Sequence, residues 1–537
     1  MRHGPLILAI LLVAAAPVNG GDLLSTDRSV HEAIDHYVNA RLQSTNTQPA
    51  PLAADATLLR RTMLDLVGRI PTAHEARQYV SSSDPEKRVQ LVEQLLNDPL
   101  YLTQQVEEFN SLLMFGTGSD LRGYLTDAIG ENRPWNVMFR EMLLGDPQDK
   151  EQRGAIQFIK SRLRDTDLLT NEASVLFFGI NISCAKCHDH PLVAEWSQDH
   201  FYGMKLIFNR TFENGGFVGE REYGLVSFKT TSGNERQAKL MFLSGDAVTE
   251  PASSEPTKEE KKAEKSRLEK YKKKKQPPPP PKYSRRQRLV DIALHEDGGN
   301  YLSRNIVNRL WERFFGRGLV MPLDQMHAEN EPSHPELLDW LARDFVAHGY
   351  DLQRLIRGIV LSDSYARSSR WDGDSVPSAD LFAVAQVRPL TPSQYATSLK
   401  LANLRPNYFD DTQKPEDIAK RILDAQNSAR GIASRLEQPR GDFRISVDEA
   451  LLFSNSAQFD RDILRNGGDT LIGHLAVIED NESLVTQAIW NIFTRPPEDE
   501  EVAALVAFLE ARNENRDEAI RQLAWALLSS SECRFNY

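Results

Sequence analysis

The sequence predicts a mainly α-helical protein, with two helical domains and a small β element before a Lys/Pro-rich linker. Apolar residues recur every three or four positions through most of the chain, which is the spacing of amphipathic helices. The exception is the stretch 217–244, where β-branched and aromatic residues alternate with polar ones, as in a strand. A run rich in Lys, Glu and Pro at 250–284 then separates the two helical parts.

The first domain is expected at 22–249 and begins with a series of helices. Leu59, Met63 and Leu66 recur at helical spacing, and Pro71 is expected to end that helix. Asn132 and Pro134 are suited to starting a later helix, because proline is favoured in the first turn. The helices expected in this domain lie at 29–42, about 55–70, 88–96, 106–114, 135–144 and 173–178.

The segment 250–284 is interpreted as a linker. It holds a Lys/Glu-rich run, then four lysines at 272–275 and five prolines at 277–281. A proline run favours the extended polyproline II conformation, and a charge run is typical of a solvated segment. We therefore place the domain boundary here and expect the second domain at 285–537.

The second domain is also expected to be helical. Leu302, Ile306 and Leu310 form one apolar stripe. Ser333 and Glu336 have the spacing of a capping box, which predicts Ser333 as the N-cap of the next helix. Further apolar stripes predict helices near 352–359, 498–509 and 520–527.

The first 20 residues are typical of a secretory signal sequence. Arg2 precedes an apolar run at 6–16, which is too short to span a bilayer, and small residues follow up to Gly20. Cleavage near Gly20 is expected. No later stretch predicts a transmembrane segment, so we expect an exported protein in the periplasm or at the cell surface.

The charge and the cysteine count exclude some classes of protein. The formal net charge is -12, which argues against nucleic acid as a partner, because such binding needs a basic face. There are three cysteines, Cys184, Cys187 and Cys533. Exported proteins that depend on disulfides usually contain more, so the close pair Cys184 and Cys187 indicates a dedicated site.

The strongest chemical signal is the motif Cys184-Ala-Lys-Cys187-His188. In a c-type haem site, two thiols at this spacing add to the haem vinyl groups, and the adjoining histidine binds the iron. The motif therefore predicts haem c attached through Cys184 and Cys187, with His188 as the proximal ligand. Covalent attachment after export agrees with the predicted signal sequence.

The second axial ligand would be a histidine or a methionine. His200 and Met204 are the candidates, because the chain between them and His188 is long enough to turn around the haem edge. A five-coordinate iron is also compatible with the sequence. His190 is too close to His188 to reach the opposite face, and is expected to support the site or to serve as an alternative ligand.

Two other chemistries fit the same residues. Zinc is one, because Cys184, Cys187, His188, His190 and His200 offer enough sulfur and nitrogen ligands. A redox-active or structural disulfide between the two cysteines is the other, although no thioredoxin-like pattern of strands and helices surrounds them. The sequence contains no Gly-x-Ser-x-Gly, P-loop or His-Glu-x-x-His motif.

Several segments resemble a family of secreted, planctomycete-type proteins. This family pairs two domains of unknown function, numbered fifteen forty-nine and fifteen fifty-three. RRTMLDLVGRIPT at 60–72 and CAKCHDHP at 184–191 resemble motifs of the first domain, and PSHPELLDWL at 332–341 and WALLSSSE at 525–532 resemble motifs of the second. The resemblance covers about residues 30–537, and shorter matches lie at 132–135, 196–204, 308–320 and 388–392.

The resemblance implies the layout and the compartment, while the family has no established function. Many of its members carry a cytochrome c-like domain in front, and residues 22–55 contain no second Cys-x-x-Cys-His motif. This association favours haem. We expect periplasmic electron transfer or redox chemistry with a periplasmic redox partner. The alternative is a zinc- or disulfide-stabilised scaffold, or a polysaccharide-associated surface protein, without haem.

Overall fold

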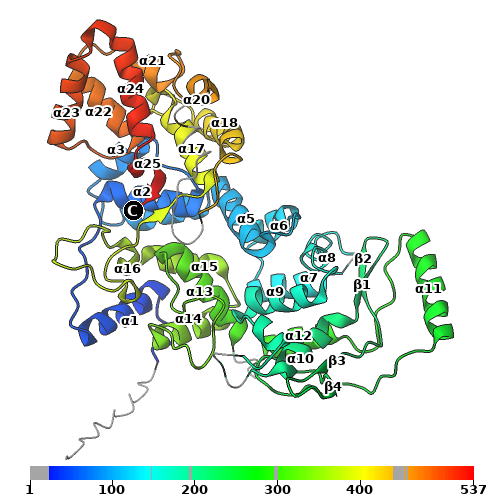
Figure 1. Cartoon of the computed structure of the whole chain (residues 1–537). Helices are drawn as coiled ribbons and strands as arrows, with labels where there is room; N and C mark the ends of the chain where they lie inside the picture. Colours follow the sequence, from blue (N-terminus) through cyan, green and yellow to red (C-terminus); the bar gives the residue numbers. More distant parts are fainter. Residues whose placement is uncertain are drawn as a thin grey trace, which may run out of the picture.

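The computed structural model describes residues 23–146, 148–190, 193, 196–295, 300–439, 453 and 457–537. These residues are mainly α-helical, which confirms the predicted fold class. The predicted signal sequence at 1–20 lies outside them. Figure 1 shows an elongated molecule: the C-terminal helices lie at one end, and the strands β1 to β4 lie at the other. No helix in the described part combines the length and the apolar character that crossing a bilayer requires.

The first helix packs against the second half of the chain. α1 (Val30–Ser44) contacts α14 (Pro335–Ala347) and α15 (Leu352–Leu361). Gly358 allows this close approach, because a Cβ atom there would lie only 2.3 Å from Cβ of Val30. The next helices are α2 (Asp55–Val67), α3 (Ala73–Ser81), α4 (Lys87–Leu96), α5 (Pro99–Met114), α6 (Arg122–Gly130) and α7 (Trp135–Leu143).

The segment that carries the cysteines lies between two helices at the end of the molecule opposite the C-terminal helices (Figure 1). α8 (Gln157–Lys160) and α9 (Thr166–Phe178) precede the short 3-10 helix η1 (Ser183–Lys186), and α10 (Gln198–Asn209) follows it. Two antiparallel hairpins come next, in and just before the stretch predicted as β. The first pairs β1 (Thr211–Asn214) with β2 (Phe217–Glu220), and the second pairs β3 (Ser227–Lys229) with β4 (Glu235–Gln237).

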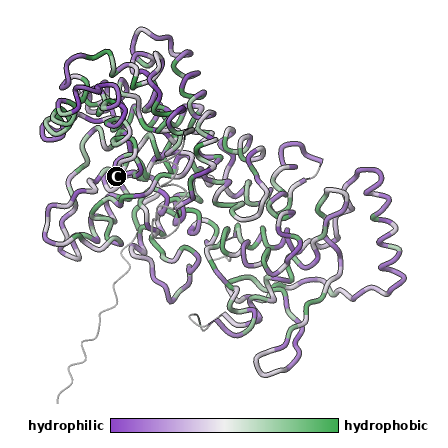
Figure 2. Tube along the Cα trace, turned by 45° about the horizontal axis from the view of Figure 1, so that its top comes forward, coloured by the Kyte–Doolittle hydropathy of each residue, from purple (hydrophilic) through white to green (hydrophobic). Residues whose placement is uncertain are grey.

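The segment predicted as a solvated linker contains a regular helix, α11 (Lys258–Lys273). Thr257 and Glu260 form a capping box at its start, and basic residues fill its last turn, where they favour the negative end of the helix dipole. No residue of α11 is buried. Figure 2 shows it as a largely hydrophilic element at the edge of the molecule.

The second half is helical, as predicted, with one correction at a helix start. The N-cap of α14 is His334, and Ser333 lies one residue before it. The Ser333 N–H donates to the Leu319 carbonyl oxygen at 2.8 Å, which holds Ser333 in the preceding loop. The elements here are α12 (Arg285–Leu294), α13 (Tyr301–Phe315), α16 (Asp363–Ala366), η3 (Ala379–Leu381), β5 (Arg388–Pro389), α17 (Pro392–Ala402), η4 (Pro406–Tyr408) and α18 (Pro415–Ala433).

The C-terminal end is a compact group of short helices that returns to the beginning of the chain. Its last strand, β6 (Phe535–Asn536), pairs antiparallel with β5. The preceding elements are α20 (Ala457–Asp462), α21 (Leu471–Leu475), α22 (Asn481–Ile492), α23 (Asp499–Glu510), η5 (Asn513–Asn515), α24 (Arg516–Leu528) and α25 (Ser531–Arg534).

The hydrophobic cores do not divide at the Lys/Pro-rich segment. One core contains buried residues from Val30 to Ala425. A second core contains residues from Leu390 to Cys533, together with Leu64 and Ile70 from the first half. The boundary at 250–284 thus follows the sequence composition, whereas the packing joins both halves across it.

A buried polar network at Asp65 of α2 ties the two ends of the chain together. Asp65 Oδ2 accepts hydrogen bonds from the Tyr365 hydroxyl and from Arg388 Nη2, each at 2.7 Å. Its other oxygen, Oδ1, accepts from Asn536 Nδ2 at 2.9 Å. The Asp65 side chain is only 4% exposed, so this carboxylate depends on these partners in place of water.

Candidate functional site

The cysteine motif forms an exposed turn with one buried anchor. Ala185 is fully buried, whereas Cys184 and Cys187 on either side are exposed. The Cys187 N–H donates to the Cys184 carbonyl oxygen at 3.3 Å, which closes one turn of 3-10 helix. Both cysteines are free thiols. The small alanine therefore holds the turn to the protein while both sulfur atoms face solvent.

His188 is exposed beside the two thiols, with one ring nitrogen already engaged. Its Nδ1 lies 2.7 Å from the carbonyl oxygen of Asp189. A carbonyl oxygen can only accept, so Nδ1 carries the proton, and Nε2 keeps its lone pair in the neutral ring. Histidines that bind metals usually have this arrangement, because the bond at one nitrogen fixes the tautomer and the ring orientation.

Side chains from α10 hold the turn through hydrogen bonds. The Tyr202 hydroxyl and Gln198 Nε2 both donate to the carbonyl oxygen of Lys186, at 3.2 and 3.4 Å. Tyr202 is itself fixed, because its ring stacks on Phe228 with 4.2 Å between centroids. The Gln198 N–H also donates to Asp189 Oδ1 at 3.3 Å, so the residues on both sides of Cys187 and His188 are anchored to one helix.

An ion cluster fixes the other edge of the turn. Asp167 of α9 contacts Lys186 Nζ at 2.8 Å and Lys205 Nζ at 2.6 Å. Burial alone would raise the pKa of Asp167, but the hydrogen bonds from the two lysines hold it below its ordinary value. Asp167 is thus a carboxylate at neutral pH and ties the motif to α9.

His190 lies inside the protein, apart from the exposed donors. The backbone N–H of His190 donates to the Trp196 carbonyl oxygen at 2.7 Å. The His190 ring meets the Trp196 ring edge-on, with 5.3 Å between ring centroids. Burial lowers the pKa of His190, and the nearby His188 acts in the same direction, while a hydrogen bond with the Asn181 backbone opposes them. The ring of His190 is thus packed inside the protein, whereas His188 is exposed.

The two candidates for the second axial ligand lie in α10, away from the exposed turn. His200 belongs to the capping box of this helix, where Nδ1 accepts from the Ser197 N–H at 3.2 Å. Its Nε2 faces Gly245, because a Cβ atom there would lie 3.1 Å away. Met204 is fully buried in the large core. The structure therefore does not bring their donor atoms to the surface beside His188.

A loop from the second half lies against the motif and was not predicted from the sequence. Ile180 and Gln325 form an antiparallel bridge, and the Met326 N–H donates to the Gly179 carbonyl oxygen at 2.9 Å. This contact brings His327 to Trp196, with 5.5 Å between ring centroids. No spacing in the sequence connects His327 with the cysteine motif, 140 residues earlier, so only the fold reveals the contact.

The exposed donors fit a covalently attached haem on the proximal side. Two free thiols lie one turn apart, and the adjoining imidazole keeps Nε2 free of the bond that holds Nδ1. The neighbouring aromatic rings are engaged elsewhere, since Tyr202 stacks on Phe228 and Trp196 packs against two histidines. For zinc, no group of three or more His, Cys, Asp or Glu side chains within the described ranges has a metal-binding arrangement.

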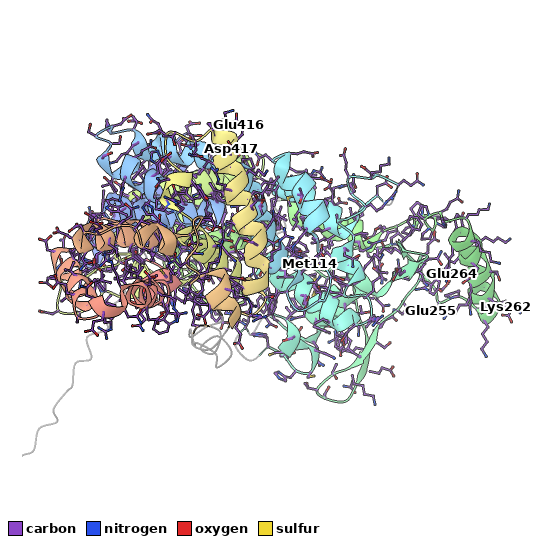
Figure 3. All side chains as sticks on the ribbon, turned by 90° about the horizontal axis from the view of Figure 1, so that it is seen from above. Met114, Glu255, Lys262, Glu264, Glu416 and Asp417 are labelled. Atoms are coloured by element: carbon purple, nitrogen blue, oxygen red, sulfur yellow. The ribbon has the colours of Figure 1, made fainter. Side chains whose placement is uncertain are left out.

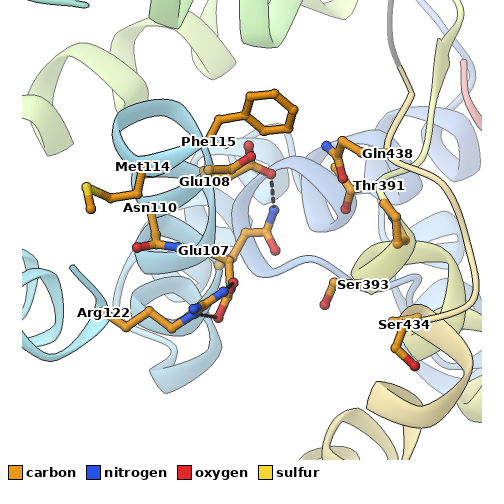
Figure 4. Close-up of a pocket in the computed structure, with 14 residues that line it drawn as sticks. Glu107, Glu108, Asn110, Met114, Phe115, Arg122, Thr391, Ser393, Ser434 and Gln438 are labelled. Carbon is orange, nitrogen blue, oxygen red and sulfur yellow. Dashed lines mark hydrogen bonds and ion pairs between the residues drawn. The ribbon is translucent and has the colours of Figure 1, made fainter. Parts of the chain in front are cut away.

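A separate cleft of about 360 Å³ lies between α5 and the α17–α18 pair. Figure 4 shows Glu107, Glu108 and Arg122 on one wall, and Ser393 and Ser434 on the other. Arg122 donates to both oxygens of Glu107, at 2.8 and 3.0 Å, so these charges neutralise each other. None of the motif residues lines this cleft.

Comparison with known proteins identifies the two parts of the chain. Residues 33–213 match the family model PSCyt2, described as a protein of unknown function (DUF1549). Residues 285–509 match the model PSD1, described as a protein of unknown function (DUF1553). No curated protein and no solved structure shows significant similarity to the chain. The chain belongs to the family of proteins that pair a PSCyt2 domain with a PSD1 domain.

Proposed function

We propose that Cys184, Cys187 and His188 attach a c-type haem, and that the protein serves in electron transfer or redox chemistry outside the cytoplasm. The observation that carries this proposal is the exposed turn with two free thiols followed by His188, whose Nδ1 is bonded to the Asp189 carbonyl oxygen. The signal-like sequence at 1–20 supports export, which haem attachment of this kind requires.

The residues of the chain have separate roles in this proposal. The thiols of Cys184 and Cys187 would add to the two haem vinyl groups as thioether links, and His188 Nε2 would bind the iron. Gln198 and Tyr202 hold the turn, so that these three donors keep their relative positions. A bound haem would supply a one-electron carrier. His200 or Met204 becomes the second ligand only if α10 rearranges, so a five-coordinate iron is the simpler proposal.

The test is to express the full chain, with its signal sequence, alongside cytochrome c maturation proteins. A pyridine haemochrome spectrum and a haem stain after denaturing electrophoresis then report covalent haem. We expect both signals in the natural protein and in Cys533→Ser, which removes a buried thiol outside the motif. We expect neither in the double variant Cys184→Ser/Cys187→Ser.

The proposal fails if the natural protein carries no covalent haem while a control cytochrome matures in the same cells. Metal analysis of the same sample separates the remaining chemistries. One zinc per chain would support the zinc-stabilised alternative. A metal-free protein whose Cys184 and Cys187 react with a thiol reagent only after reduction would support a disulfide.

A further inference from the structure

Helix α11 is an ordered arm that lies outside both family matches, which end at residue 213 and resume at 285. Its inner side is attached to the first hairpin and to the segment that directly follows β2. The Tyr223 hydroxyl donates to Glu264, and Arg221 lies 3.7 Å from the same carboxylate. Asn214 Nδ2 donates to the Leu268 carbonyl oxygen at 3.0 Å. The helix is therefore held in one orientation on the body of the protein.

The side of α11 that faces away from the body carries a row of lysines. At 3.6 residues per turn, every lysine of this row lies more than a quarter turn around the helix axis from Glu264, the residue that faces the hairpin. Figure 3 shows Glu264 towards the body and Lys262 on the outer side of the helix. The row consists of Lys258, Lys262, Lys265, Lys270 and Lys273, all exposed and spaced roughly 4–8 Å along the axis.

This arm has the opposite charge to the rest of the protein. Residues 258–275 contain ten Lys or Arg against four Glu, a net charge of +6, while the whole chain carries -12. The remainder therefore carries -18. Glu264 and Glu260 lie on the side of the hairpin, whereas Glu259 and Glu269 lie on the outer side, so the outer face carries five lysines against two glutamates. The outer row is thus a local positive ridge that attracts an anionic partner at moderate ionic strength.

We propose that the outer face of α11 binds a linear acidic polysaccharide through the carboxylates along its chain. A convex ridge of spaced ammonium groups offers repeated point charges and no enclosing pocket, which suits a long polymer with regularly repeated anionic groups. Lysine ammonium groups are compact point charges on flexible stems, so they adapt to carboxylates at varied spacing.

The composition of the outer face argues against two other anionic partners. A helix that lies in a bilayer surface presents aromatic or large apolar residues to the lipid, and the only apolar residue on this side is Ala263. Proteins that bind single-stranded nucleic acid use aromatic stacking platforms, and Tyr271, the aromatic residue of α11, lies on the inner side with Glu264. This inference is independent of haem, because α11 contains none of the motif residues.

The test measures binding of the full-length protein to polygalacturonate, a polymer with one carboxylate per sugar. The comparison ligands are neutral dextran, single-stranded DNA and vesicles containing anionic phosphatidylglycerol. We expect polygalacturonate to bind most tightly, with affinity that falls as salt rises to about 0.15 M. Changing the five outer lysines to glutamine should weaken this binding at least about tenfold. Glutamine has nearly the helix propensity of lysine, so α11 should remain folded, as circular dichroism will check.

A matched control variant tests whether the loss of binding is specific to α11. It changes five exposed lysines elsewhere to glutamine, namely Lys150, Lys229, Lys239, Lys414 and Lys420, which alters the net charge equally. We expect it to bind polygalacturonate within about twofold of the natural protein. The proposal is overturned if both variants lose binding equally, if the arm variant binds normally, or if DNA, vesicles or dextran bind as well as polygalacturonate.

Discussion

Asn181 connects the cysteine turn to Asp324 in the second half of the chain. The Asn181 N–H donates to the Asp324 carbonyl oxygen at 2.8 Å, and Asn181 Nδ2 donates to Asp324 Oδ2 at 2.9 Å. The Asn181 Oδ1 atom accepts from the N–H and the hydroxyl of Ser183, at 3.1 and 2.7 Å. One side chain thus caps η1, which carries Cys184, and at the same time docks this segment on the PSD1 domain.

Asn181→Ala should loosen the cysteine turn. The change removes the acceptor for Ser183 and the donor for the Asp324 carboxylate, which together should lower the free energy of unfolding by about 1–3 kcal/mol. Hydrogen exchange of residues 183–188 should also rise. Asp324→Ala is the matched variant, because it removes the docking bond and leaves the cap. Equal exchange of the turn in both variants would contradict the capping role.

Asp65 should be far more important for stability than an exposed acidic residue. Replacing it with asparagine removes the charge that compensates Arg388 in a site where Asp65 is only 4% exposed. Breaking a buried ion pair typically costs about 3–5 kcal/mol. We expect Asp65→Asn to lower the free energy of unfolding in urea by on the order of 3 kcal/mol. The control, Glu107→Gln, disrupts a half-exposed pair and should cost under about 1 kcal/mol. Similar costs for both would show that the Asp65 network is not essential.

The sequence predicted helices well, because most of them bury an apolar stripe that recurs at local spacing. It did not predict what the polar residues within those stripes contact. Arg60 of α2 donates to the Glu532 carbonyl oxygen, 472 residues later, and Asp65 binds Arg388. Such partners depend on tertiary packing and leave no periodic signal. His327 was missed for the same reason, since only the bridge between Ile180 and Gln325 brings it near Trp196.

The cysteine motif and α11 show two different limits of prediction. The motif was predictable because its chemistry is local, with both thiols and His188 within five residues. The sequence does not show that Ala185 is buried and the thiols exposed, because burial depends on α10 and α9. For α11, the charge run indicated a solvated linker, whereas Thr257 and Glu260 already had the spacing of a capping box. The local capping signal was the better guide there.

Acid should destabilise the protein through His334. Burial lowers the pKa of His334 to about 4, and the positive charge of Arg41 acts in the same direction. Between about pH 6.5 and pH 4 the unfolded chain binds a proton that the folded state does not, so stability falls as pH falls through this window. The loss from this one group should reach roughly 3 kcal/mol at pH 4.

Denaturant unfolding at several pH values from 7 to 4 will check the role of His334. His334→Phe keeps a ring against Phe382 without a titrating group, so its stability should depend less steeply on pH. Gln43→Asn, which changes an exposed side chain without a titrating group, should keep the natural pH dependence. Because burial also lowers the pKa values of His190, His327 and His474, some dependence will remain in all variants. An unchanged slope in His334→Phe would contradict the assignment.

The proposed haem site predicts different results for its thiols and its histidine. His188→Ala removes the iron ligand and leaves both thiols, so covalent haem should persist while its visible spectrum changes. Cys184→Ala or Cys187→Ala should each reduce the haem that survives denaturing electrophoresis.

Gln198→Ala is the informative fourth variant, because it removes the donor to Lys186 without touching any proposed haem ligand. We expect it to lower the yield of attached haem and leave the spectrum unchanged, since a looser turn presents the same ligands less often. An unchanged spectrum in His188→Ala would show that His188 is not the proximal ligand, and a changed spectrum in Gln198→Ala would show that Gln198 does more than hold the turn.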